Sequence, residues 1–208
     1  MNYESLILDI DGTLWDSRAL VAEGYNIQLK REGLEHLFVD AEILKPLFGK
    51  VKTEIADALL SSIPAPERYD LMARCMETEN RYLFENECRI GYPGVTETVA
   101  ELAKKYRLFI VSNSECGYPE LCIEKLGLTP YIQDHLCFGD TGTSKGKTIR
   151  TLMAKNNIEN AIYIGDTQGD YEATVEAGLP FVWCTYGFGT PEGYVAKVDN
   201  FAELLNLF

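Results

Sequence analysis

The chain has 208 residues, of which 46% are hydrophobic and 25% charged, the composition of an ordinary globular protein that can bury a sizeable core. Its formal net charge of −13 argues against a nucleic-acid-binding surface, which needs a basic patch. No apolar run approaches the length of a membrane span, and the N-terminus lacks a signal-peptide pattern, so we expect a cytoplasmic protein that binds neither membranes nor nucleic acid.

The predicted strands are short, continuous apolar runs separated by helix-like segments. Continuous runs of this kind are typical of strands buried on both faces of a parallel sheet. The regular alternation predicts βαβ units, and therefore an α/β fold with a doubly wound parallel sheet. In chain order the strands are expected at 6–8, 108–111, 136–138, 161–164 and 181–183, and the helices at 94–105, 118–127, 146–157 and 169–178.

A long segment between the first and second strands contains only helical patterns. Apolar residues recur there at helical spacing, and Pro64 and Pro66 mark a break between two helices. We therefore predict an all-helical domain at 17–88, inserted into a core domain made of residues 1–16 and 89–208.

Six cysteines are spread along the chain without any CxxC pair, at positions 75, 88, 116, 122, 137 and 184. Two of them, Cys137 and Cys184, lie within apolar runs that predict strands. We therefore expect buried free thiols in a reducing compartment, rather than a zinc site or a disulfide framework.

Polar residues follow the predicted strands at the edge where a parallel sheet binds its ligands. Two positions apart, Asp9 and Asp11 would point to the same face of the first strand and would repel each other unless they shared a cation. Asp166 ends the fourth strand and would add a third carboxylate. A cluster rich in oxygen, with no His or Cys, suits Mg²⁺.

The stretch GDTGTSKGKT, residues 139–148, is similar to a nucleotide-binding P-loop because it joins an apolar run to a helix-like run. A P-loop places four residues between its first glycine and the Gly-Lys pair, whereas only three follow Gly142. The loop is therefore one residue too short to wrap a phosphate in that way. Lys145 and Lys147 remain two candidates for a lysine that binds phosphate as a point charge.

Four segments together resemble the motifs of the haloacid dehalogenase superfamily. DIDGTLWDS at 9–17 resembles the first motif, Ser112 the second, the loop around Lys145 the third, and GDTQGD at 165–170 the fourth. Their order and spacing fit across nearly the whole chain, and the helical insertion matches the superfamily's helical cap. The overall pattern is most similar to phosphoglycolate phosphatase-like enzymes. One departure is Gly146, where the superfamily often has proline after the lysine.

The resemblance implies a Mg²⁺-dependent phosphatase that acts on a small phosphorylated metabolite. Asp9 would be the nucleophile that forms an aspartyl-phosphate, and Asp11 would act as general acid and then as general base. Ser112 and Lys145 would bind the phosphoryl oxygens, and Lys145 is the lysine that best matches the third motif.

The remaining site residues follow from the same resemblance. Mg²⁺ would lie between Asp9, the backbone carbonyl of Asp11, and Asp166, with Asp170 holding the metal shell in place. The substrate would also contact backbone N–H groups of the loop that ends at Thr13 and of Asn113, and a cap lysine, Lys50 or Lys52, would meet an anionic leaving group.

Several alternatives stay open at this point. A phosphomutase uses the same two aspartates, although Thr13 favours a phosphatase, and a dehalogenase has no need for Asp11 or a metal. A P-loop ATPase or kinase would depend on Lys147, and a module that binds phosphate without catalysis would not need the intact set of motifs. We expect a monomer or a homodimer.

Overall fold

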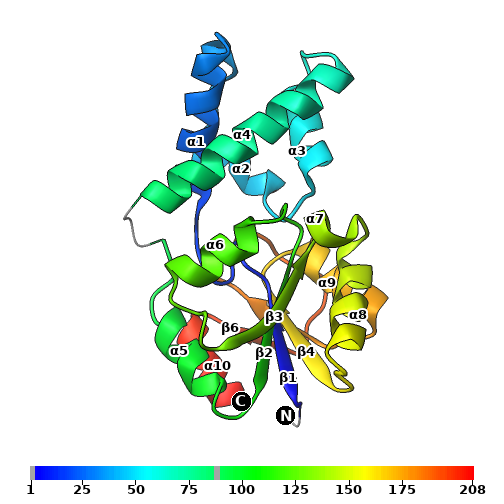
Figure 1. Cartoon of the computed structure of the whole chain (residues 1–208). Helices are drawn as coiled ribbons and strands as arrows, with labels where there is room; N and C mark the ends of the chain where they lie inside the picture. The colour runs from blue at the N-terminus through cyan, green and yellow to red at the C-terminus, as the bar shows by residue number, and fades with distance from the viewer. Residues whose placement is uncertain (1–2, 87–89) are drawn as a thin grey trace. The chain divides into compact units, whose positions relative to one another are not determined.

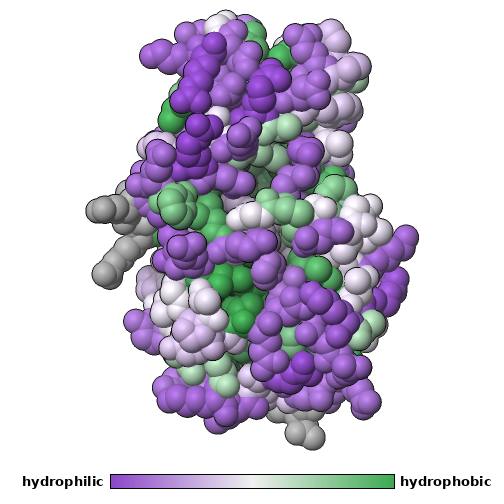
Figure 2. Space-filling view, in the orientation of Figure 1, coloured by the Kyte–Doolittle hydropathy of each residue, from purple (hydrophilic) through white to green (hydrophobic). Residues whose placement is uncertain are grey.

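The computed structural model describes residues 3–86 and 90–208 (Figure 1). The chain divides into two compact units, one formed by Met1–Asp16 with Ile90–Phe208 and the other by Ser17–Arg89. The predicted boundary at residues 88 and 89 lies outside the described residues. The face drawn in Figure 2 is mainly hydrophilic, as expected for a chain with a net charge of −13.

A six-stranded sheet forms the centre of the first unit, in the order β3-β2-β1-β4-β5-β6. All five strand pairings are parallel, so the predicted α/β fold with a doubly wound parallel sheet is confirmed. The order reverses beside β1, which places the ligand-binding edge near the carboxyl ends of β1, β2 and β4. The strands are β1 (Ser5–Leu8), β2 (Arg107–Ser112), β3 (Ile132–Cys137), β4 (Ala161–Gly165), β5 (Phe181–Cys184) and β6 (Ala196–Val198).

Helices cover both faces of this sheet, with α5 and α10 on one side and α8 and α9 on the other (Figure 1). On the α8 side the core contains Ile7, Phe109 and Tyr163 from the strands, packed with Ile149 and Leu152 from the helix. The helices of this unit are α5 (Val95–Leu102), α6 (Tyr118–Lys125), α7 (Phe138–Thr141), α8 (Lys145–Lys155), α9 (Gln168–Ala177) and α10 (Leu204–Leu207), with a short 3₁₀ turn, η3 (Phe201–Glu203).

Among the strands, β3 has different boundaries from those predicted, and β6 was not predicted. β3 covers Ile132–Cys137 rather than 136–138, and Phe138 begins α7 instead of ending the strand. β3 is the edge strand of the sheet and carries half-exposed polar residues, so only its last residues form an apolar run. β6 was not predicted, because its three residues do not form such a run.

The second unit is helical in all the elements that the structure describes. Its two longest helices, α1 (Arg18–Arg31) and α4 (Ala65–Glu85), pack closely because Gly24 has no β-carbon to meet the backbone of Glu79. A buried hydrogen bond of 2.9 Å from Thr78 to Gln28 also joins them. The shorter helices are η1 (Glu35–Leu37), α2 (Ala41–Leu44), η2 (Lys45–Leu47) and α3 (Lys52–Leu59). No described helix combines the length and apolar character that crossing a bilayer requires.

The five cysteines of the described residues are all free thiols. Cys75, Cys122, Cys137 and Cys184 are buried, as expected, but Cys116 is exposed because it lies in the loop after β2. Cys88 lies outside the described residues.

Candidate active site

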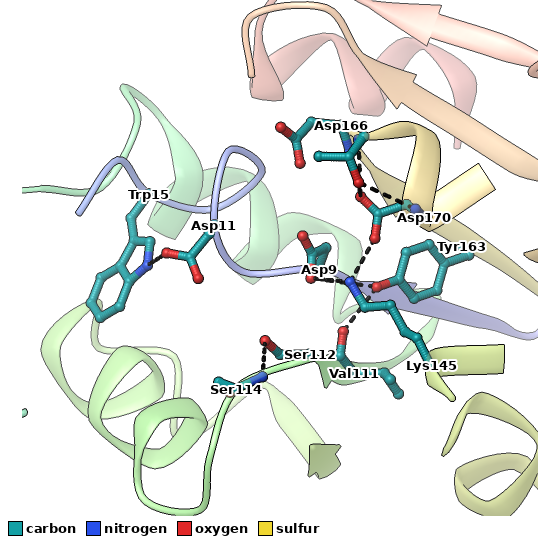
Figure 3. Close-up of polar contacts among 11 residues, drawn as sticks. Asp9, Asp11, Trp15, Val111, Ser112, Ser114, Lys145, Tyr163, Asp166 and Asp170 are labelled. Atoms are coloured by element: carbon teal, nitrogen blue, oxygen red, sulfur yellow. Dashed lines mark hydrogen bonds and ion pairs between the residues drawn. The ribbon is translucent and has the colours of Figure 1, made fainter. Parts of the chain in front are cut away.

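The candidate site lies at the carboxyl ends of β1, β2 and β4 (Figure 3). Asp9 follows the last residue of β1, and its backbone N–H still donates to the carbonyl of Ile164 in β4 at 2.9 Å. Ser112 is the last residue of β2, and Asp166 follows the last residue of β4. The topology therefore brings together three segments that are far apart in the sequence.

Lys145, at the first position of α8, points into a group of carboxylates. Its ammonium donates to Asp9 Oδ1 at 2.7 Å and to Asp170 Oδ1 at 2.5 Å, and only 6% of the residue is exposed. Burial disfavours the charged form, but Asp170 and Asp9 outweigh burial and hold the pKa of Lys145 well above its usual value. Lys147, by contrast, is exposed at the surface.

The segment before these lysines does not have the form of a P-loop. Residues Phe138–Thr141 form the helical turn α7, and Gly142 then has a left-handed backbone with φ of 59°. Ser144 caps α8 directly before Lys145 by accepting from the N–H of Lys147 at 3.4 Å. The segment therefore forms a helical turn and a helix cap instead of a phosphate-binding loop. Lys145, and not Lys147, lies among the carboxylates.

Asp170 is held by the turn that begins α9. Its Oδ2 accepts from the N–H of Thr167 at 2.9 Å, from the hydroxyl of Thr167 at 2.7 Å, and from the N–H of Asp166 at 3.2 Å. Burial opposes ionisation, but Lys145 and these donors outweigh it, so the pKa of Asp170 lies below its usual value. Asp170 is thus a fixed, ionised carboxylate that positions Lys145.

Asp9 and Asp166 are buried carboxylates whose negative charge is not fully offset by nearby cations, and the pKa of each is raised. Burial, with help from Asp170, raises the pKa of Asp9 to about 7 despite the contact with Lys145. The same two causes hold the pKa of Asp166 well above its usual value. Asp166 is fully buried, and its Oδ1 accepts no hydrogen bond from the residues that the structure describes.

This environment fits a divalent cation with oxygen ligands. Carboxylate oxygens of Asp9, Asp166 and Asp170 lie within 4.8 Å of one another, and the ammonium of Lys145 bonds to two of these residues. When all three carboxylates are ionised, they and the one ammonium carry a net charge of −2 in a buried site, which Mg²⁺ would neutralise. The partnerless oxygen of Asp166 would serve as one ligand.

Two glycines allow neighbouring loops to approach Asp166. A β-carbon at Gly12 or at Gly187 would overlap the carboxylate of Asp166. The backbone N–H of Phe188 donates to Asp166 Oδ2 at 2.6 Å, so the loop after β5 also orients this side chain. Phe188 was not predicted as a site residue, because a backbone donor leaves no signal in the residue type.

Asp11 lies beyond the end of β1. The strand ends at Leu8, so its alternation does not extend to Asp9 and Asp11, and their common face stays a prediction. Asp11 Oδ1 accepts from the indole N–H of Trp15 at 2.9 Å and from the hydroxyl of Tyr118 at 2.7 Å, and its carboxylate turns toward Trp15 (Figure 3). These two donors orient Asp11 beside the group of three carboxylates rather than within it.

The end of β2 supplies hydroxyl and backbone groups. Ser112 is 4% exposed, and its Oγ accepts from the N–H of Ser114 at 3.2 Å, while Asn113 is half-buried next to it. Tyr163 was not predicted as a site residue. Its hydroxyl donates to the carbonyl of Val111 at 2.8 Å, and its ring centre lies 5.5 Å from the ammonium of Lys145.

The remaining predicted residues lie in different surroundings. Thr13 is fully buried, and in this conformation the N–H groups of Gly12 and Thr13 donate to Trp15 and Ile10 within their own turn rather than to a ligand. Lys50 is exposed and Lys52 begins α3, both in the helical unit. A role for these two lysines stays a prediction.

Comparison with known proteins agrees with these motifs. The model of the haloacid dehalogenase-like hydrolase family matches residues 6–184. The chain belongs to this family. A curated phosphoglycolate phosphatase from Rhodobacter capsulatus is 28% identical to this haloacid dehalogenase-like hydrolase over 208 residues, which cover 96% of the chain and 94% of the relative.

Solved structures of the family share the fold. A haloacid dehalogenase-like hydrolase from Streptococcus pneumoniae superposes with a TM-score of 0.83 at 18% identity, covering 99% of this chain and 98% of its own. CbbY from Rhodobacter sphaeroides, in complex with xylulose-1,5-bisphosphate, has a TM-score of 0.75 at 20% identity, with 98% and 96% coverage. Each of these similarities extends over nearly the whole of both chains.

Proposed function

We propose that this hydrolase is a Mg²⁺-dependent phosphatase that cleaves a small phosphorylated metabolite through an aspartyl-phosphate. The observation that carries the proposal is the placement of Asp9. Its carboxylate is buried and contacts the ammonium of Lys145, beside the partnerless oxygen of Asp166. A nucleophilic carboxylate needs such compensation when a negatively charged phosphoryl group approaches it.

In the first step, a carboxylate oxygen of Asp9 attacks phosphorus, and the bond from phosphorus to the leaving oxygen breaks. Asp11 protonates that oxygen. Hydrogen bonds from Trp15 and Tyr118 to its Oδ1 orient the carboxyl group that donates the proton. The product alcohol leaves, and the phosphoryl group stays on Asp9.

In the second step, water attacks the phosphoryl group on Asp9, and Asp11 accepts the proton of that water. The bond from phosphorus to Asp9 breaks and releases inorganic phosphate and the free carboxylate. Lys145, which contacts Asp9, would compensate the charge of the phosphoryl oxygens in both steps, and Ser112, the last residue of β2, would donate to them.

Asp9, Asp166 and the backbone carbonyl of Asp11 would hold the Mg²⁺. When bound, this ion would offset the repulsion between the phosphoryl group and the carboxylates. Asp170 would support the site without binding the ion directly, because its two oxygens are engaged by Lys145 and by the residues of its own turn.

The relatives favour 2-phosphoglycolate or a similarly small anion as the substrate. Several curated relatives are named phosphoglycolate phosphatase, and the one from Rhodobacter capsulatus is 28% identical to this chain. Lys50 or Lys52 of the helical unit would bind the carboxylate of such a substrate. The net charge of −13 repels anions at long range, so local cations are required for this binding.

A panel of phosphorylated metabolites, assayed for phosphate release with Mg²⁺ and with a chelator, tests this function. We expect turnover that depends on Mg²⁺, with 2-phosphoglycolate among the best substrates. Intact-protein mass spectrometry after an acid quench should detect one added phosphoryl group, and Asp9→Asn should abolish both signals. Isomerisation of a sugar phosphate without phosphate release would instead support a phosphomutase, and full activity of Asp9→Asn would exclude the mechanism.

A further inference from the structure

A second group of metal-ligating side chains lies beside the proposed phosphatase residues, because Cys137 pairs with Ser112 across β3 and β2. Cys116 lies in the loop after β2, Cys137 is the last residue of β3, and Asp140 lies in α7. One ligand atom from each, two sulfurs and one carboxylate oxygen, lie within 4.8 Å of one another. Cys116 is exposed and Cys137 is buried, so an ion could reach this group from solvent and be held by a residue of the core.

The distances within this group are close to the edges of a tetrahedral metal site, with each sulfur contacting a different oxygen of Asp140. Asp140 Oδ1 lies 3.5 Å from the sulfur of Cys116, and Oδ2 lies 3.1 Å from the sulfur of Cys137. With bonds of about 2.3 Å to sulfur and about 2.0 Å to oxygen, a tetrahedral zinc ion separates the two kinds of ligand by about 3.5 Å. Small shifts of the side chains would therefore allow one ion to contact all three.

Gly139 is the residue that allows Cys116 to reach the group. A β-carbon at this position would lie 2.5 Å from the backbone nitrogen of Cys116 and 2.8 Å from its sulfur. The N–H of Gly139 also donates to the carbonyl of Ser114 at 3.1 Å, which fixes the two segments against each other. The backbone therefore positions the thiol of Cys116, so the contact does not depend on a flexible side chain alone.

The three side chains of this group already contact one another through hydrogen bonds. Asp140 Oδ1 accepts from the thiol of Cys116, and Oδ2 accepts from the thiol and the backbone N–H of Cys137. A divalent cation would replace the two thiol protons, so the net charge of the group would stay at −1.

We propose that Cys116, Cys137 and Asp140 form a binding site for a thiophilic divalent cation, with Zn²⁺ as the best fit and the fourth position open to solvent. Sulfur ligands distinguish this site from the oxygen-lined group of Asp9, Asp166 and Asp170. The ion would join the loop that follows Ser112 to the segment that leads to Lys145. The hydrogen bond of 2.7 Å between Thr141 and Thr148 connects α7 to α8.

Titration of the reduced full-length chain with Co²⁺, in excess Mg²⁺ to occupy the oxygen-lined site, tests this proposal. We expect about one Co²⁺ per chain, with the intense near-ultraviolet absorption of a thiolate-to-cobalt bond and the visible bands of a tetrahedral ion, and displacement by Zn²⁺. Cys116→Ser should lower the affinity for Zn²⁺ about 100-fold or more, and Asp140→Asn about 10-fold. Cys75→Ser, which removes a buried thiol from the helical unit, is the matched control and should not change it.

Three results would overturn the proposal. One is Co²⁺ binding without the thiolate absorption, and another is an unchanged Zn²⁺ affinity in Cys116→Ser. The third is a metal-free chain that binds no Co²⁺ but readily forms a Cys116–Cys137 disulfide with oxidised glutathione, which would identify a redox pair instead. Because Cys116 is exposed, its replacement by serine should not disturb folding, and circular dichroism checks this.

Discussion

Lys145 and Lys147 lie two positions apart at the start of α8, but only Lys145 contacts carboxylates. We expect Lys145→Met to lower kcat on the order of 10²–10³-fold, because it removes a charge-assisted contact to the reacting phosphoryl group. Lys147→Met, the matched control, should keep most of the activity. Steady-state kinetics measures both. Loss of activity in Lys147→Met together with tight ATP binding by calorimetry would favour a nucleotide-binding protein instead.

Tyr118 and Trp15 orient Asp11 by donating to the same oxygen. Tyr118→Phe removes one donor but keeps the edge-to-face contact of the two rings, whose centres are 5.5 Å apart. We expect kcat to fall about 10-fold with little change in KM, because a hydrogen bond to a charged group contributes about 1.5 kcal/mol and Asp11 does not bind the substrate phosphate.

Tyr106→Phe is the control for this prediction, since Tyr106 precedes the start of β2, at the opposite end from Ser112, and its hydroxyl donates to the carbonyl of Phe208. Steady-state kinetics of the two variants, measured side by side, separates positioning from general stability. Equal kcat values in Tyr118→Phe and Tyr106→Phe would show that Trp15 alone suffices to position Asp11.

Residue types and their spacing predicted the charged residues of the site, but not the tyrosines that contact them. Asp9, Asp166 and Lys145 follow strand ends or begin a helix, so parallel topology brings them together once the strands are recognised. Tyr163 and Tyr118 could not be predicted in this way. Each lies in an apolar or helical pattern that core packing explains equally well, and only the tertiary structure shows where its hydroxyl points.

At the level of secondary structure, the loop after β5 closes against Asp166 because Gly187 has no side chain. We expect Gly187→Ala to displace this loop and the Phe188 N–H, and so to weaken Mg²⁺ binding about 10-fold or more. Gly169→Ala is the matched control. The added methyl group would meet only the Thr167 hydroxyl, at 3.6 Å, and alanine favours the helix in which Gly169 lies.

The Mg²⁺ affinity of Gly187→Ala and of Gly169→Ala is measured from the Mg²⁺ dependence of turnover. Thermal unfolding shows whether either variant has lost its fold. A Gly187→Ala protein with normal Mg²⁺ affinity would mean that the loop does not orient Asp166.

The elements that escaped prediction share a physical cause. Buried central strands such as β1 and β4 have uniform surroundings, which produce continuous apolar runs. β3 lies at the edge of the sheet and β6 has only three residues, so neither carries that signal over its full length. α7 is a single turn inside what the sequence presents as a glycine-rich loop, and a segment that short has no helical periodicity.

For the whole molecule, the buried carboxylates make stability depend on pH and metal. The folded-state pKa of Asp9, about 7, lies above the ordinary value of 3.8, and that of Asp166 is raised as well. Between pH 3.8 and about 7, the folded chain therefore binds more protons than the unfolded chain. The free energy of unfolding should fall as pH rises through this window. Asp170, whose pKa is lowered, acts in the opposite direction but only below the ordinary value.

We therefore expect metal-free protein to unfold more easily at about pH 7.5 than at about pH 5, by an amount that Asp9→Asn reduces. Asp9→Asn is the control, because the exposed groups titrate equally in this variant and in the wild type. The difference between the two proteins therefore reports the titration of Asp9. Mg²⁺ binds the ionised carboxylates, so it should raise stability more at the higher pH. Urea unfolding at both pH values, in a chelator and in Mg²⁺, measures these differences. If the difference between wild type and Asp9→Asn were constant over this range, Asp9 would be ionised in the metal-free fold, and Lys145 alone would balance its charge.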